Sequence, residues 1–137
     1  MKVTPRTRRE KVQVFADDTG VVSHVGSALL GELADRFGRT QELSAAMAPT
    51  RTRPSGNDPG WVIRDLALIL AGGGDCLADL GALRDQVGLF GAVASDATAY
   101  RVIDSIDDER LGAIRAARAK ARRRAWAAGP RREAIVL

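Results

Sequence analysis

The side chains in this sequence that could do chemistry are its acids, one histidine, one cysteine and a glycine-rich turn. The acids form two groups at helical spacing: Asp75, Asp79 and Asp85, then Asp104, Asp107 and Asp108. Paired carboxylates can serve as general acid and base when a positioned partner and a substrate lie within hydrogen-bond reach. Here the polar neighbours are few and the spacing favours solvated helix faces. We therefore predict helix caps and surface residues, and no catalytic residue.

Metal chemistry is also not expected. His24 and Cys76 are the single histidine and cysteine, and they lie far apart in the sequence. A zinc site generally needs four protein ligands, or three and a water. We predict no metal site and no cofactor in this chain. A lone cysteine cannot form an intrachain disulfide, and a cytoplasmic location is the default expectation.

The run Gly72-Gly73-Gly74-Asp75 invites comparison with a phosphate-binding loop. A Walker loop requires a lysine and a Ser/Thr after the glycine, and neither follows here. A dinucleotide-binding turn needs a preceding strand, whereas Val62–Leu70 is long and well capped, as a helix would be. The glycines are therefore interpreted as a tight turn between helices.

A sharper pattern is SDATAYRVI over Ser95–Ile103. A small polar cap followed by Thr98 and Arg101 is common in helices that enter the major groove of DNA. Ser95 and Thr98 can bond to phosphate or base, and Arg101 can reach phosphate or guanine. Asp96 argues against close phosphate contact. An ordinary capped core helix with a surface arginine explains the pattern equally well.

Charge is unevenly distributed along the 137 residues, whose net charge is +4. Residues 111–137 carry eight basic residues against Glu133, and the first residues are basic as well. Basic ends suggest a polyanionic partner, with a solvated cationic helix as the alternative. The arginines expected to contact DNA phosphates are Arg115, Arg118, Arg122 and Arg123. Arg115, Arg118, Arg122 and Arg124 fall away from an apolar line formed by Leu111, Ile114, Ala117, Ala121 and Ala125.

The elements that must position these residues are mostly helical. We expect helices over Val21–Phe37, Gln41–Ala48, Gly60–Ala71, Cys76–Asp85, Ser95–Ile106 and from about Asp107 to Ala128. Asp58, Asp75 and Ser95 are the expected caps. In the first helix, the residues expected to face inward are Val22, Val25, Leu29, Leu33 and Phe37. Gly88–Ala94 is expected to turn the chain.

The predicted fold is therefore a small, mainly α, multi-helix domain with a helix-turn-helix-like unit and a short N-terminal β-strand. That strand is KVQVFA, residues 11–16, and residues 1–10 are expected to form a disordered basic tail. The helical region would span residues 11–128. No apolar run approaches the roughly 20 residues that span a bilayer, so no membrane partner is expected.

Three stretches of the sequence resemble one known family. They are FADDTGVVSHVGSALLGELADRFG, the run from DPGWVIRDLALILAGGGDCLADL to LFGAVASDATAYRVID, and the Ala/Arg helix with Trp126. Together they are similar to the N-terminal part of bacterial insertion-sequence transposases of the DDE class, which carry an RNase H-like catalytic domain. The second stretch is the most specific.

The resemblance implies DNA binding at the terminal inverted repeats of a mobile element. It also implies catalysis by three carboxylates that hold divalent metal such as magnesium, on a domain absent here. Residues 129–137, ending in Ala-Ile-Val-Leu, would begin that domain, so we expect a fragment that binds DNA without catalysing transposition. Two alternatives remain open. The chain could be an interaction module that self-associates or inhibits intact transposase, or a decayed gene product without function.

Overall fold

The computed structural model describes residues 24–53 and 56–129, and this part of the chain is mainly helical. Seven α-helices and two short 3-10 helices, joined by turns and loops, occur among these residues, and no strand occurs among them. The mainly α prediction is therefore confirmed. The expected strand at residues 11–16, the basic tail at 1–10 and residues 130–137 lie outside the described residues.

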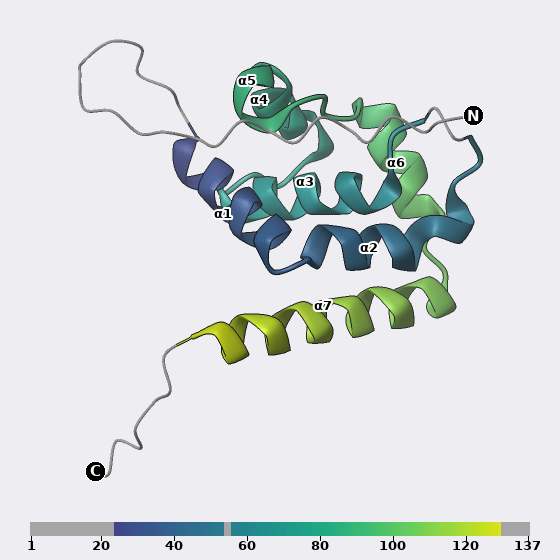
Figure 1. Cartoon of the computed structure of the whole chain (residues 1–137). Helices are drawn as coiled ribbons and strands as arrows, with labels where there is room; N and C mark the ends of the chain where they lie inside the picture. The colour runs from purple at the N-terminus through teal and green to yellow at the C-terminus, as the bar shows by residue number, and fades with distance from the viewer. Residues whose placement is uncertain (1–23, 54–55, 130–137) are drawn as a thin grey trace, which may run out of the picture.

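Three helices form the centre of the molecule (Figure 1). They are α1 (Val25–Arg36), α2 (Arg39–Met47) and α3 (Pro59–Ala71). A 3-10 turn, η1 (Ala48–Thr50), follows α2. Beyond α3 come η2 (Leu77–Asp79), α4 (Leu80–Arg84), α5 (Val87–Phe90) and α6 (Asp96–Asp104). The last helix, α7 (Asp108–Ala128), runs along α2 on the side away from α3.

Local sequence explains where the main helices begin. Asp58 accepts a hydrogen bond from the Gly60 amide at 2.8 Å, and Pro59 takes the first helical position. Ser95 caps α6 by accepting from the Thr98 amide at 3.3 Å. Asp107 caps α7 in the same way, from Arg110 at 2.7 Å, and acids occupy the first turn of that helix, where its dipole favours them. The caps predicted at Asp58 and Ser95 are confirmed.

The core lies between α2, α3, α4 and α6. Its fully buried side chains include Leu43, Met47, Leu80, Leu83 and Phe90. α2 and α3 meet backbone to backbone at Gly60, where a Cβ would lie 2.2 Å from the Ser44 nitrogen. Only glycine allows this approach, which fixes α2 beneath α3 and so gives α7 its platform.

The structure corrects the expected packing of the first helix. Leu29 and Leu33 were predicted to face inward, but each is nearly half exposed, and Ala28 and Gly31 are buried instead. α1 packs through its small residues, which allow it to lie close to α2 and α3. Apolar spacing alone does not distinguish a small-residue face from a leucine face.

The segment after α3 is also more broken than expected. The predicted helix Cys76–Asp85 is a 3-10 turn followed by the five-residue α4, and Asp79 rather than Asp75 bonds the free amides at its start. The turn predicted at Gly88–Ala94 contains part of α5, which buries Phe90. Leu70 of α3 and Ile103 of α6 are apolar but exposed. A helix-turn-helix geometry is not established by this arrangement.

Candidate nucleic-acid interface

One side of α7 is held firmly against α2. Ala117 and Ala121 are buried there, and Glu42 of α2 accepts from Lys120 at 2.7 Å and from Arg124 at 2.8 Å. The hydrogen bond from Lys120, helped by that from Arg124, holds the pKa of Glu42 below its ordinary value. Arg124 was expected to point away from the packed side, but it follows Ala117 and Ala121 on the α2 side of the helix and pairs with Glu42.

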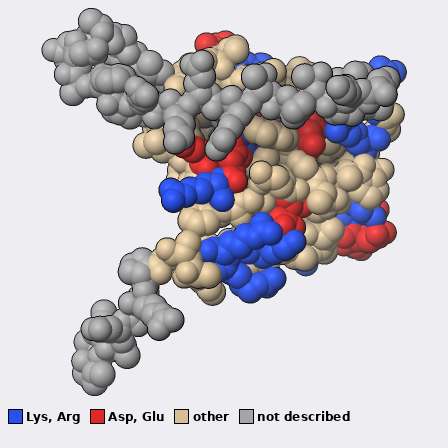
Figure 2. All heavy atoms as spheres, viewed as in Figure 1, with Lys and Arg blue, Asp and Glu red and all other residues tan. Residues whose placement is uncertain are grey.

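The opposite side of α7 carries exposed cations. Successive residues of an α-helix turn by about 100°, which places Arg115 and Arg122 on the side away from Ala117 and Ala121, with Arg118 at the edge of that side, about 60° around the helix from Ala121. These arginines and Arg123 are exposed. Among the described residues none of them has an ion-pair partner, and no acidic residue occurs from position 110 to 128. Basic side chains gather along α7 in the space-filling view (Figure 2).

We call these four side chains, Arg115, Arg118, Arg122 and Arg123, the basic face of α7. An exposed aromatic residue, Trp126, lies next to this face. Trp126 is 72% exposed, and its ring centroid lies 5.3 Å from the Arg122 guanidinium carbon. Leu111, expected to point inward, is 37% exposed. The sequence pattern predicted that Arg115, Arg118 and Arg122 fall away from the apolar line, and all three are exposed, but it did not single out Trp126 as a surface residue.

The three side chains of α6 that were predicted to contact DNA lie apart from the basic face of α7 and already form hydrogen bonds within α6. Ser95 donates to Thr98 at 3.1 Å, and Arg101 donates to the Ala97 carbonyl at 3.0 Å and to Thr98 at 3.4 Å. Asp96 pairs with Arg84 of α4 at 2.7 Å, which offsets its negative charge. Because this end of α6 lies beside α4 while α7 lies on α2, the two predicted sets do not form one patch.

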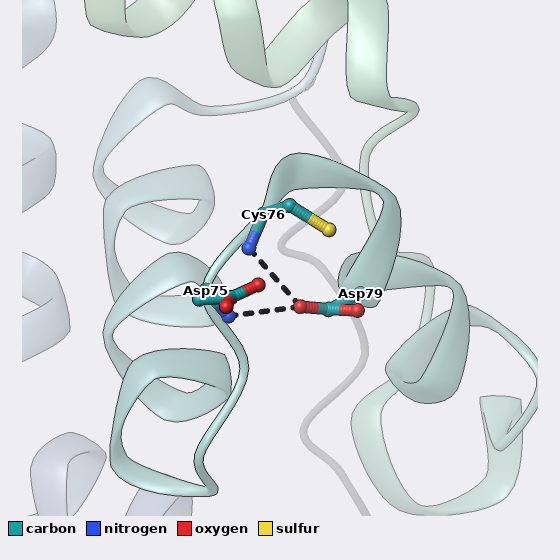
Figure 3. A group of neighbouring side chains, drawn as sticks. All are labelled: Asp75, Cys76 and Asp79. Carbon is teal, nitrogen blue, oxygen red and sulfur yellow. Dashed lines mark hydrogen bonds between the residues drawn. The ribbon is translucent and has the colours of Figure 1, made fainter.

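A group of acids near η2 has the composition of a metal site but a different structural use (Figure 3). Ligand atoms of Asp75, Cys76 and Asp79 lie within 4.8 Å of one another. Asp79 accepts from the amides of Cys76 and Asp75, at 3.1 and 2.9 Å, and these bonds hold the pKa of Asp79 below its ordinary value. Magnesium prefers oxygen ligands in an octahedral set, and a thiol is a poor member of one. The group therefore fits a helix start better than a catalytic metal.

A hollow of about 350 Å³ lies beside this group. His24, the Gly72–Gly74 turn, Asp75 and Asp79 line it. His24 thus lines the same hollow as Asp75 and Asp79, although about 50 positions separate it from them in the sequence. His24, Asp75 and Cys76 are exposed. No buried donor points into the hollow, among the residues described, that would mark a ligand.

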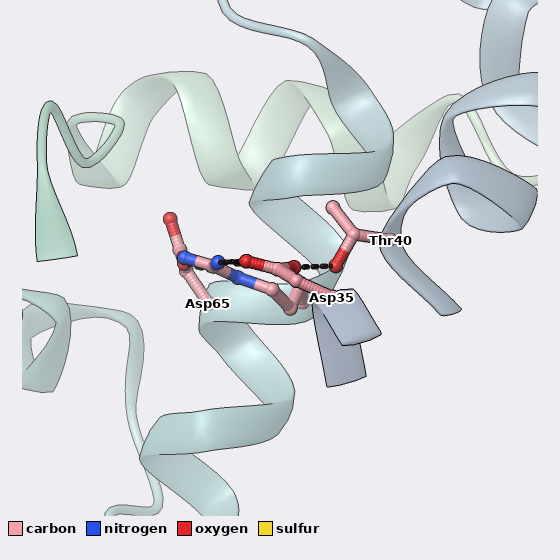
Figure 4. Close-up of polar contacts among 4 residues, drawn as sticks. Asp35, Thr40 and Asp65 are labelled. Atoms are coloured by element: carbon pink, nitrogen blue, oxygen red, sulfur yellow. Dashed lines mark hydrogen bonds and ion pairs between the residues drawn. The ribbon is translucent and has the colours of Figure 1, made fainter. Parts of the chain in front are cut away.

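A buried charged cluster, which was not predicted from the sequence, lies at the centre of the molecule. Arg64 of α3 is 2% exposed, pairs with Asp65, and donates to Asp35 of α1 at 3.2 Å. Thr40 of α2 donates to the same Asp35 carboxylate (Figure 4). The guanidinium carbon also lies 4.4 Å from the Trp61 ring centroid. The available signal was a charged pair inside an otherwise apolar helix.

Fold and surface together define a small helical module with a cationic outer helix. Comparison with protein families gives the affiliation: residues 4–137 match the family described as transposase DDE domain group 1. The chain belongs to this DDE transposase family, which connects it with DNA transposition. No curated protein and no solved structure matches it. Among the described residues, no helix is long and apolar enough to cross a membrane.

Proposed function

We propose that this helical region binds DNA for a DDE transposase, and that the basic face of α7 makes the phosphate contacts. The observation that carries the proposal is a row of exposed arginines without ion-pair partners in the described part of the chain, on a helix face without acids. Such cations neutralise phosphates and release the counterions condensed on DNA. The family match supports DNA as the polyanion.

The platform beneath α7 supports the same proposal. Glu42 engages Lys120 and Arg124, so the α2 side of the helix is bound while the outer side faces solvent. Over the span from Arg115 to Arg122, a helix rises about 10 Å, which matches roughly three phosphates along one strand of B-DNA. A fixed helix presents these charges without an ordering step on binding.

Duplex binding tests this proposal directly. Fluorescence anisotropy at low salt should show binding of the full chain to a labelled terminal-repeat duplex. Arg118→Ala should weaken binding and reduce the slope of log K against log salt by about 0.9. Arg53→Ala removes an equal charge from the loop before α3 and serves as the matched control. Absence of duplex binding at low salt would contradict the proposal.

We further propose that the start of α6 contributes sequence preference through Ser95, Thr98 and Arg101. The observation in its favour is that Arg84 offsets the charge of Asp96, which removes the main electrostatic objection. Arg101→Ala should then reduce the ratio of affinities for terminal-repeat and scrambled duplexes. An unchanged ratio would leave α6 with a structural role and α7 as the DNA-contacting helix.

A second candidate function is self-association or assembly with intact transposase. Three leucines on α1, Leu29, Leu30 and Leu33, are between 46% and 48% exposed. Apolar side chains gathered on one helix face commonly mark protein contacts. Light scattering after size exclusion should show an assembly that Leu30→Asp and Leu33→Asp disperse, and a monomeric wild-type chain would exclude self-association.

A further inference from the structure

Trp126 is placed where a structural role does not account for it. It lies near the end of α7, four residues after Arg122 and eight after Arg118, and so continues the outer side of the helix. Its ring is 72% exposed. The Arg122 guanidinium carbon lies 5.3 Å from its ring centroid, a distance suited to cation–π attraction. A large aromatic ring thus faces solvent among arginines.

The chemistry of this surface indicates what would cover it. A flat π-surface beside cations complements a ligand that is both flat and anionic, which describes a nucleotide. The face has no carboxylate between residues 110 and 128 that would repel phosphate. An anionic lipid surface is less well matched, because a membrane-binding helix needs a free apolar side, and that side of α7 is packed on α2 through Ala117 and Ala121.

We propose that Trp126 stacks on an unpaired base of single-stranded or locally opened DNA, while Arg118 and Arg122 bind the adjoining phosphates. This inference rests on the proposed function, because it requires α7 to face DNA. A continuous duplex keeps its base faces within the stack and offers α7 only phosphates. An unstacked base exposes the face that an aromatic side chain binds, largely irrespective of sequence. The surface therefore distinguishes opened from closed DNA.

Titration with two DNA forms tests the inference. The full chain would be titrated with oligo-dT of about 12 nucleotides, a length within the usual range of single-strand sites, and with a blunt duplex of the same length. Oligo-dT should quench the tryptophan emission. Trp126→Ala should weaken binding of oligo-dT by about tenfold or more and change duplex affinity by less than about twofold. Trp126→Phe should retain most of the single-strand affinity.

Tyr100→Ala provides a matched control, because Tyr100 is an aromatic residue of similar exposure, 62%, on α6. It should leave the affinity for oligo-dT unchanged. Equal loss of duplex and single-strand affinity in Trp126→Ala, or no loss in either, would overturn the inference. The proposed function would still stand in that case, provided that the wild type binds the duplex. Stronger and Trp126-dependent binding to phosphatidylserine vesicles would overturn it in favour of lipid. Failure of the wild type to bind duplex would instead contradict the proposed function itself.

Discussion

Arg64 of α3 and the arginines of α7 have the same side chain in opposite settings. Arg64 is buried, donates to two carboxylates and lies against an aromatic ring. The basic face of α7 is exposed, and its arginines have no ion-pair partner among the described residues. A guanidinium has five donors, and in the first case the protein occupies several of them. The difference separates an arginine that holds the fold from arginines available to a partner.

The largest expected effect comes from removing the buried arginine. Arg64→Ala leaves Asp65 buried without its guanidinium and removes the bond to Asp35, so it should lower the free energy of unfolding by about 3–5 kcal/mol. Urea denaturation followed by circular dichroism measures this. Arg64→Lys keeps the charge but loses the planar fork of the guanidinium, so its free energy of unfolding should lie between those of the wild type and Arg64→Ala. A loss below about 1 kcal/mol for Arg64→Ala would place Arg64 outside the stabilising cluster.

A smaller loss of stability is expected at the start of α6. Ser95→Ala removes the cap that accepts from the Thr98 amide and should cost about 1 kcal/mol of stability. Ser105→Ala, whose hydroxyl donates to the Val102 carbonyl within the same helix, should cost less. If Ser95→Ala left the free energy of unfolding unchanged, the Ser95 hydroxyl would not stabilise the fold and, like the arginines of α7, would be free to contact a partner.

The contact between α2 and α7 should depend on pH. Since pairing with Lys120 and Arg124 lowers the pKa of Glu42 in the folded state, its contribution is present above the ordinary value of 4.5 and is lost as pH falls through the lower folded value. The melting temperatures of the wild type and Glu42→Gln should therefore converge as the solution is acidified. Curves that stay equally separated from neutral pH to below pH 4 would contradict this role.

The smallest expected effect is at the basic face. Arg118→Ala makes the same chemical change as Arg64→Ala, but it should alter the free energy of unfolding by less than about 0.5 kcal/mol, because the side chain is exposed and has no described partner. Denaturation under the conditions used for Arg64→Ala makes the comparison direct. Destabilisation above about 1 kcal/mol would show that Arg118 stabilises the fold after all.

How far the sequence predicted this arrangement depends on whether the signal was local. The caps at Asp58 and Ser95, the start of α7 at its acids and the exposure of Arg115, Arg118 and Arg122 follow from chemistry within a few residues. Charge and helical periodicity were sufficient there. The family resemblance was confirmed over residues 4–137.

The sequence-based predictions that were wrong or missing concern contacts between segments far apart in the sequence. Whether Leu33 or Gly31 faces the core depends on how closely α1 approaches its neighbours. The pairing of Arg64 with Asp35 joins residues 29 positions apart, and that of Arg124 with Glu42 joins residues 82 apart. No local pattern encodes such partners, so the sequence predicted that Arg124 falls away from the apolar line and gave no role to Arg64.

The most direct test of the central claim removes the whole basic face at once. In a variant with Arg115, Arg118, Arg122 and Arg123 replaced by alanine, both duplex affinity and unfolding should be measured across a salt series. We expect the slope of log K against log salt to fall by roughly 3 to 4, at about 0.9 for each lost phosphate contact, with nearly unchanged stability. An unchanged slope in a folded variant would contradict the claim that α7 binds DNA.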